Sequence, residues 1–396
     1  MLPFEEALER VLGNARRLGS ERVAVGDALG RVLAETLRAD SPMPAFDYSA
    51  MDGYAVASSG FHGAMPVTLP VVGESQTGHE PPELTPGTAC RIFTGAVLPA
   101  GADAVVMQEN VERDGDRATF SAQPKAGDHV RHAGEDLAVG QVAVKAGTRL
   151  GGGQLGLCAA LDRAHVHVAR RPRVTIVCTG DELRAPGEKP WPGSIPESNG
   201  IALSGWVRQA GGEPVIAPLA RDDREATSMA LRTALAESDV VLTVGGVSVG
   251  DHDVVRPALE AAGATLDFYK VRIKPGKPLV FGNAGTTHVL GLPGNPVSAQ
   301  VTFALFGMAL LRTMQGDAQA RPPLRRGRLA KPLRQKPGRR GYYRAQHSAE
   351  GVIPLDNQAS GAPTSMAWAD CLVIVPEDSE GFEAGTEVDV IQLGDL

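Results

Sequence analysis

Several stretches of this sequence place glycines, carboxylates and hydroxyls at spacings that suit phosphate and metal chemistry. The richest is DVVLTVGGVSVGDHD, residues 239–253, in which an apolar run is followed by glycines, a serine and two acids. Glycines let backbone N–H groups approach an anion closely, and nearby acids can hold a hard cation such as Mg²⁺ against phosphate oxygens. The stretch predicts a phosphate-and-metal site from Gly245, Gly246, Ser248, Gly250, Asp251 and Asp253. The alternative is a glycine-rich turn whose acids cap the next helix.

A second stretch, KPGKP, carries positive charge on a constrained loop. It holds Lys274 and Lys277 beside two prolines and a glycine, and Lys270 comes four residues before it. Lysines restrained in this way are suited to binding an oxyanion by charge, whereas solvated loop lysines are the ordinary alternative.

The segment LPGNPVS lies further along the same region. Its two prolines, Pro293 and Pro296, restrain a turn that opens a helix. Backbone amides near Asn295 to Ser298 can then face an anion, because the first N–H groups of a helix lack partners within it.

These residues need an α/β framework to bring them together. Apolar strand-like runs in VTIVCTGDEL, at Val240 to Val244 and at the start of THVLGLPGNP alternate with helix-like segments, which predicts a largely parallel sheet with helices on both faces. The strands end near Thr179, Val244 and Leu290, and Asp181 and Glu182 follow the first of them. Ligands of such sheets sit beyond the carboxyl ends of the strands, so we expect the three loops to meet at one edge.

The first part of the chain is organised differently. Residues Pro3 to Leu18 have apolar positions on one helical face and predict a helix. From about residue 41 to 137 the sequence is β-like and punctuated by prolines, which predicts a small inserted β domain. Within it, Asp52-Gly53 precedes a short strand-like segment, and Thr94-Gly95 follows another. Simple turns are the alternative interpretation of both.

The tail is β-like as well, and its charge is one-sided. Residues 318–344 hold ten Lys or Arg and no acid. A basic stripe can indicate nucleic acid, but stacking aromatics are sparse, so a small anion or a solvated face is the better interpretation.

Composition sets wider limits. At 396 residues two to four domains are expected, and 43% apolar residues allow ordinary cores. No run of about 18 apolar residues occurs, so we expect no membrane span. The four cysteines lie far apart, the N-terminus is acidic, and the net charge is −7. We therefore expect a cytoplasmic protein whose main partner is not nucleic acid.

Eight motifs stand in one order along the chain: SAMDGYAV, RIFTGA, RHAGED, TGDEL, RDD, GGVSVGDHD, KPGKP and GLPGNPVS. Together they resemble the molybdopterin molybdenumtransferase family, the MoeA proteins and the E domain of gephyrin. The resemblance covers essentially the whole chain. It implies α/β plus β domains: a multidomain protein with a MogA/MoaB-like α/β domain, an inserted small β domain and a C-terminal β-barrel-like domain.

The implied division of the chain has five parts. They are an N-terminal helix packed on the α/β domain (1–20), a linker domain (21–40 and 138–170), the inserted β domain (41–137), the α/β domain (171–317) and the C-terminal β domain (318–396).

The resemblance also implies a reaction. Adenylylated molybdopterin and molybdate give molybdenum cofactor and AMP, and Mg²⁺ assists cleavage of the pyrophosphate link. The implied catalytic residues are Asp52, Thr94, Glu182, Asp222 and Asp253, and the implied metal ligands are Glu182, Asp251 and Asp253. The implied substrate-binding residues are Asp136, Gly245, Gly246, Ser248, Gly250, Lys270, Lys274, Lys277, Pro293, Asn295, Pro296, Ser298, Arg344 and Ser365.

The family further implies a homodimer with shared active sites, in which Asp52 and Thr94 of one subunit face Glu182 and Asp253 of the other. Two alternatives differ in class: a non-catalytic molybdopterin-binding scaffold, and a molybdopterin adenylyltransferase. This chain departs from many members at Tyr48, where they have Asn, and at Pro196-Glu197, where they have Tyr-Asp. Molybdate and tungstate have the same charge and nearly the same size, so the motifs do not choose between them.

Overall fold

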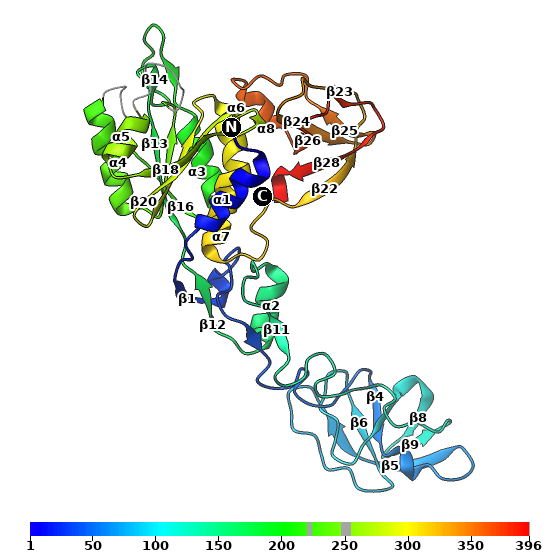
Figure 1. The fold of residues 1–396 in the computed structure, drawn as a ribbon. Helices are drawn as coiled ribbons and strands as arrows, with labels where there is room; N and C mark the ends of the chain where they lie inside the picture. Colours follow the sequence, from blue (N-terminus) through cyan, green and yellow to red (C-terminus); the bar gives the residue numbers. More distant parts are fainter. Residues whose placement is uncertain (220–223, 247–254, 396) are drawn as a thin grey trace. The chain divides into compact units, whose positions relative to one another are not determined.

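The structure, a computed structural model, describes residues 1–219, 224–246 and 255–395. It divides into two compact units (Figure 1). Unit 1 comprises residues 1–34, 147–151 and 165–396, and unit 2 comprises residues 35–146 and 152–164. The domain limits expected from the sequence stay a prediction.

A six-stranded sheet forms the centre of unit 1. Its order is β16 (Glu213–Ile216), β13 (Arg173–Cys178), β17 (Val240–Val244), β21 (Thr287–Leu292), β20 (Pro278–Ala284) and β18 (Thr265–Lys270). The first four strands pair in parallel, whereas β20 pairs antiparallel with both β21 and β18. The sheet is thus less uniformly parallel than expected. Only Gly285 and Thr286 separate β20 from β21, and so short a connection can join only antiparallel strands.

Helices cover both faces of this sheet, as the alternating pattern predicted. Val240, Leu242 and Val244 of β17 point into one core, and Val241 points into the other. The first core includes α1 (Phe4–Asn14), α3 (Asn199–Gln209), α6 (Pro296–Thr302) and α7 (Met308–Gln315). The second includes α4 (Arg224–Glu237) and α5 (Val255–Ala261), which Figure 1 shows on the opposite side.

Two helices differ from their expected form. The N-terminal helix ends at Asn14, not Leu18, because Ala15 adopts an extended backbone and Leu18 N–H donates to the carbonyl of Met314. A π-helical turn, η4 (Phe303–Gly307), joins α6 to α7. Within the described residues, the stretch Pro296–Gln315 is long and apolar enough to cross a membrane, but 89% of the apolar window is buried. Packing against the sheet accounts for its composition.

A second sheet in unit 1 forms the C-terminal domain. Its order is β19 (Ile273–Lys274), β24 (Arg340–Ser348), β26 (Cys371–Val375), β28 (Glu387–Gln392) and β22 (Leu324–Arg328), and β25 (Gly351–Pro354) also pairs with β24. A bridge between Leu329 and Val352 closes the sheet into a barrel-like form. Helix α8 (Pro363–Trp368), the pair β23 (Leu333–Arg334) and β27 (Gly381–Phe382), and η5 (Leu393–Asp395) complete it.

Smaller pairs complete unit 1. They are β1 (Ser20–Ala24) with β12 (His165–Ala169), and β14 (Leu183–Arg184) with β15 (Ile195–Pro196).

Unit 2 is mainly β structure. Its six-stranded sheet has the order β7 (Ala104–Met107), β4 (Gly53–Val56), β6 (Ala89–Ile92), β5 (Val67–Ser75), β9 (Arg117–Phe120) and β8 (Val111–Asp114). Two small pairs, β2 (Leu37–Arg38) with β11 (Val142–Val144) and β3 (Tyr48–Ser49) with β10 (Val130–Arg131), and α2 (Gly152–Ala160) accompany it. The β-like prediction for residues 41–137 is confirmed.

Candidate anion pocket and strand-end site

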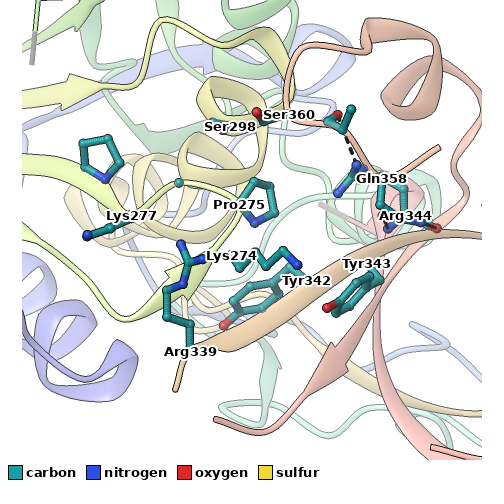
Figure 2. Close-up of a pocket in the computed structure, with 13 residues that line it drawn as sticks. Lys274, Pro275, Lys277, Ser298, Arg339, Tyr342, Tyr343, Arg344, Gln358 and Ser360 are labelled. Atoms are coloured by element: carbon teal, nitrogen blue, oxygen red, sulfur yellow. Dashed lines mark hydrogen bonds between the residues drawn. The ribbon is translucent and has the colours of Figure 1, made fainter. Parts of the chain in front are cut away.

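Unit 1 contains a cavity of about 410 Å³ where the α/β sheet meets the C-terminal sheet. The junction is made by β19, which pairs in parallel with the start of β24. Figure 2 shows side chains from separate segments of the chain arriving at this cavity. Its lining residues are Lys274, Pro275, Gly276, Lys277, Pro278, Ser298, Arg339, Tyr342, Tyr343, Arg344, Gln358, Ala359 and Ser360.

The KPGKP loop forms one wall. Gly276 has a backbone φ of +99°, a conformation that residues other than glycine rarely adopt. A Cβ at this position would also collide with Cγ2 of Thr302 on α6. The glycine therefore lets the loop lie directly on the helix, with Lys274 and Lys277 exposed on either side of it.

Arg344 of β24 is the most unusual residue of the cavity. It is only 1% exposed, yet it forms no ion pair with any acid in the described part of the chain. Its Nε donates to Ser365 Oγ at 3.2 Å and its Nη2 donates to the carbonyl of Ala359 at 3.4 Å. Burial lowers the pKa of this guanidinium to about 10. A buried cation without a counter-charge is costly, and an anion in the cavity would offset that cost.

The backbone around Arg344 is fixed by Gln358. The amide N–H of Arg344 donates to Gln358 Oε1 at 3.1 Å, and Gln358 Nε2 donates back to the Arg344 carbonyl at 2.8 Å. This reciprocal pair holds the strand and the loop after β25 together, so that the guanidinium enters the cavity in one orientation.

The start of α6 forms the opposite wall. Asn295 Nδ2 donates to Ser360 Oγ at 3.0 Å, and the amide of Val297 donates to the Ser360 carbonyl at 3.1 Å. The expectation that amides from Asn295 to Ser298 face an anion is therefore wrong for Val297, whose N–H is already used. Ser298 itself is buried and lines the cavity.

The cavity is strongly electropositive. Its lining includes Lys274, Lys277, Arg339 and Arg344 and no acid. Lys274 Nζ also lies 5.7 Å from the centre of the Tyr343 ring. Four cations around so small a space favour a compact oxyanion.

A second group of predicted residues gathers at the carboxyl ends of the parallel strands. Glu182 follows β13, Gly245 and Gly246 follow β17, and Pro293 follows β21. The expected meeting of three loops at one edge is confirmed. Lys270 ends β18 of the same sheet and is not among the residues that line the cavity.

The glycines at this edge are required by close packing. Gly245 has a φ of +89°, and a Cβ there would lie 2.9 Å from the Thr179 carbonyl oxygen. Asn199 Nδ2 donates to the Gly294 carbonyl at 2.9 Å, which ties the start of α3 to the turn after β21. The loops therefore pack backbone against backbone.

Carboxylates at this edge suit a hard cation. Glu182 and its neighbour Asp181 supply oxygen donors, the ligands that Mg²⁺ prefers. No group of three or more His, Cys, Asp or Glu side chains is placed to hold a metal among the residues described. The predicted residues Asp222, Ser248, Gly250, Asp251 and Asp253 lie outside the described residues.

Unit 2 holds the third group. Both the amide and the hydroxyl of Thr94 donate to Asp52 Oδ1, at 2.7 and 2.8 Å. These two bonds, the backbone one first, lower the pKa of Asp52 and keep its carboxylate ionised. Asp136 is exposed, and its amide donates to the Met43 carbonyl at 3.0 Å. Asp52 and Thr94 thus form one cluster, and no hydrogen bond joins Asp136 to it.

Arg339, Gln358 and Ser360 were missed from the sequence. Arg339 belongs to the basic stripe at 318–344, which was the available signal for it. Gln358 and Ser360 lie in a polar loop with no motif, and only the fold brings them to Arg344.

Three family models match successive parts of the chain. They are the "MoeA N-terminal region (domain I and II)" over residues 2–161, the "Probable molybdopterin binding domain" over 175–313 and the "MoeA C-terminal region (domain IV)" over 326–393.

Relatives with this family name and solved structures agree. A molybdopterin molybdenumtransferase from Nostoc is 35% identical over 94% of this chain and 89% of its own length. Molybdopterin molybdenumtransferase 2 from Mycobacterium tuberculosis is 37% identical over 94% of both chains. The crystal structure of a molybdopterin biosynthesis moeA protein from Pyrococcus horikoshii superposes with a TM-score of 0.88 at 30% identity, covering 99% of this chain and 100% of that one.

Proposed function

The chain belongs to the MoeA family of molybdopterin molybdenumtransferases, and we propose that it transfers molybdenum from molybdate to adenylylated molybdopterin, giving molybdenum cofactor and AMP. The observation that carries the proposal is the buried, unpaired guanidinium of Arg344 in a cavity lined only by cations and neutral groups.

The cavity has the features that a tetrahedral dianion needs. Arg344 supplies directional N–H donors from within the protein, and Lys274 and Lys277 supply charge from the loop. The Ser365 hydroxyl holds Nε of Arg344, so Ser365 positions the guanidinium rather than lining the cavity itself. The low exposure of Arg344 limits competition from water, which strengthens the contacts of its guanidinium.

The strand-end site has the features that a pterin nucleotide needs. Gly245 and Gly246 allow close approach of the backbone to a pyrophosphate. Glu182, with Asp251 and Asp253, would hold Mg²⁺, which would supply positive charge to the pyrophosphate oxygens.

The family resemblance also supports a homodimer with shared active sites and a cytoplasmic location. It does not favour nucleic acid as a partner, and the tail agrees. Five arginines of the basic stripe form ion pairs with acids from α1 and from residues 383–395: Arg321–Glu9, Arg325–Asp395, Arg326–Asp389, Arg334–Glu383 and Arg340–Glu5.

The test compares Arg344→Met with Arg326→Met, a surface arginine of the same domain that pairs with Asp389. AMP release from adenylylated molybdopterin is measured against molybdate concentration at saturating Mg²⁺. Loss of one charged hydrogen-bond donor is expected to raise the molybdate requirement of Arg344→Met by about tenfold or more. Arg326→Met should match the unmodified chain.

Two outcomes would contradict the proposal. One is an unmodified chain that releases AMP equally well without molybdate. The other is an Arg344→Met variant with an unchanged molybdate dependence, which would move the oxyanion site elsewhere.

A further inference from the structure

A second buried guanidinium lies in unit 1, apart from the cavity at Arg344. Arg312 is in the last turn of α7 and is only 6% exposed. Its Nε is buried without a hydrogen-bond partner. Burial, and after it the nearby charge of Arg149, lowers the pKa of Arg312. Asp317 acts in the opposite direction, as the smallest of the three causes, so burial outweighs the attraction of this carboxylate.

Asp317, the acid that influences Arg312 electrostatically, is already occupied. Asp317 Oδ2 accepts bonds from Arg149 Nε at 3.1 Å and Nη2 at 2.9 Å. Its other oxygen, Oδ1, accepts the amide of Gln319 at 2.9 Å. Asp317 therefore neutralises Arg149 and leaves Arg312 without a carboxylate of its own.

Two more arginines stand beside Arg149. Arg171 Nη1 lies 3.5 Å from the carbonyl oxygen of Gly211, and Arg149 Nη1 lies 3.2 Å from the point where a Cβ on Gly211 would stand. Arg31 lies close enough to help lower the pKa of Arg171, after burial as the main cause. Arg149 also donates to the carbonyl of Gly30, the residue before Arg31, and its partner Asp317 donates its amide to the carbonyl of Arg312. Four arginines from four separate segments thus lie in one region of unit 1.

The acids around this arginine cluster (Arg31, Arg149, Arg171 and Arg312) do not balance it. Glu21 pairs with Arg31, and Asp317 pairs with Arg149. Glu213 influences Arg171 electrostatically but forms no ion pair with it in the described structure. Arg17 adds a further cation near Gly316, the residue before Asp317. The cluster therefore keeps an excess of positive charge in a largely desolvated place.

We propose that the arginine cluster binds a small tetrahedral dianion such as inorganic phosphate, with Arg312 as the principal donor and Arg149 and Arg171 beside it. Arginine presents several N–H donors in one plane, and a dianion matches the excess charge of the cluster. Binding there would join α7 to the segments that carry Arg149 and Arg171. The site is independent of the proposed enzymatic activity.

Arg312→Met tests the proposal because it keeps the length of the side chain and removes its charge. Without phosphate, removal of an uncompensated buried cation is expected to leave the melting temperature equal or raise it. With millimolar phosphate at constant ionic strength, the unmodified chain should gain stability through ligand linkage, and Arg312→Met should gain less. In Arg312→Met the apparent dissociation constant for phosphate at this site should rise about tenfold.

Two further variants separate this site from the cavity at Arg344. Arg344→Met should retain the phosphate-induced stabilisation that depends on Arg312. Arg312→Met should retain any phosphate-induced stabilisation that depends on the cavity at Arg344. Arg326→Met, at the surface, serves as the control for a general salt effect. Equal phosphate-induced shifts in Arg312→Met and in the unmodified chain would overturn the proposal. So would a phosphate-free Arg312→Met that is clearly less stable, because Arg312 would then be held by protein groups alone.

Discussion

The carboxylate of Asp52 shows how one neighbouring residue can set a protonation state. Thr94 contributes both its amide and its hydroxyl to the same oxygen. Because both bonds favour the charged form, the pKa of Asp52 falls below its ordinary value. The ionised carboxylate therefore stabilises the fold above the unfolded pKa, and this contribution is lost as the pH falls through the folded pKa.

Thr94→Val removes the hydroxyl and keeps the amide. We expect the pKa of Asp52 to rise part of the way back toward its ordinary value, so that protonation sets in at a higher pH. A carbon-13 titration of the Asp52 carboxyl measures this directly. Thr119→Val is the matched control, since the Thr119 hydroxyl bonds to Thr68 and to no carboxylate. An unchanged Asp52 titration in Thr94→Val would show that the hydroxyl does not contribute.

At the scale of elements, the KPGKP loop is shaped by the helix beneath it. Gly276 can approach Thr302 only because it lacks a side chain, and this approach sets where Lys274 and Lys277 stand relative to Arg344. The positions of the two lysine charges at the cavity thus depend on the uncharged contact between Gly276 and Thr302.

Gly276→Ala is therefore expected to destabilise the protein in two ways, by straining the backbone at residue 276 and by overpacking against Thr302. A left-handed backbone angle costs about 1 kcal/mol for alanine, and forced overpacking adds about 1–3 kcal/mol. Gly285→Ala is the control, because Gly285 also has a positive φ, of +58°, but has open space around its Cβ position. Chemical denaturation should show the larger loss for Gly276→Ala, accompanied by weaker oxyanion binding. Equal losses in both variants would mean that the contact with Thr302 relaxes without cost.

At the scale of the whole molecule, the proposed shared site can be tested by mixing chains. Asp52→Asn damages a residue of unit 2, and Glu182→Gln damages a residue of unit 1. If one subunit's Asp52 serves with the other's Glu182, a mixed dimer has one intact site and one doubly damaged site. Co-refolding two inactive variants in equal amounts should then restore about a quarter of the unmodified activity, since about half of the dimers are mixed.

The opposite arrangement gives a different result. If Asp52 and Glu182 of one chain served the same site, every site in the mixture would carry a lesion. The mixture would stay as inactive as its parents, and the shared-site proposal would be wrong. Each variant refolded alone is the control for recovery of protein.

Much of the α/β framework could be predicted from local sequence. The run Val240 to Val244 is apolar at every position but one, and such a strand has to be buried on both faces. The glycines after it predict a close backbone approach, which the φ of +89° at Gly245 confirms. Strand ends and turns are local features, because they depend on the periodicity and conformational freedom of a few neighbouring residues.

The charges needed the tertiary structure. The sequence shows a stripe of ten Lys or Arg without an acid at residues 318–344, yet acids far away in the chain pair with five of them. Arg344, from the same stripe, is buried and forms no ion pair within the described residues. Arg312 precedes the stripe, and no sequence motif marks it.

Local sequence thus determined where the strands end, where the backbone must be glycine and which family the motifs resemble. Only the tertiary structure decided which cations are neutralised and which remain available to an anion. The physical reason is that an ion pair requires two groups within a few ångströms, and a buried charge is defined by everything packed around it. Residues as distant as Glu5 and Arg340 meet only when the whole chain has folded.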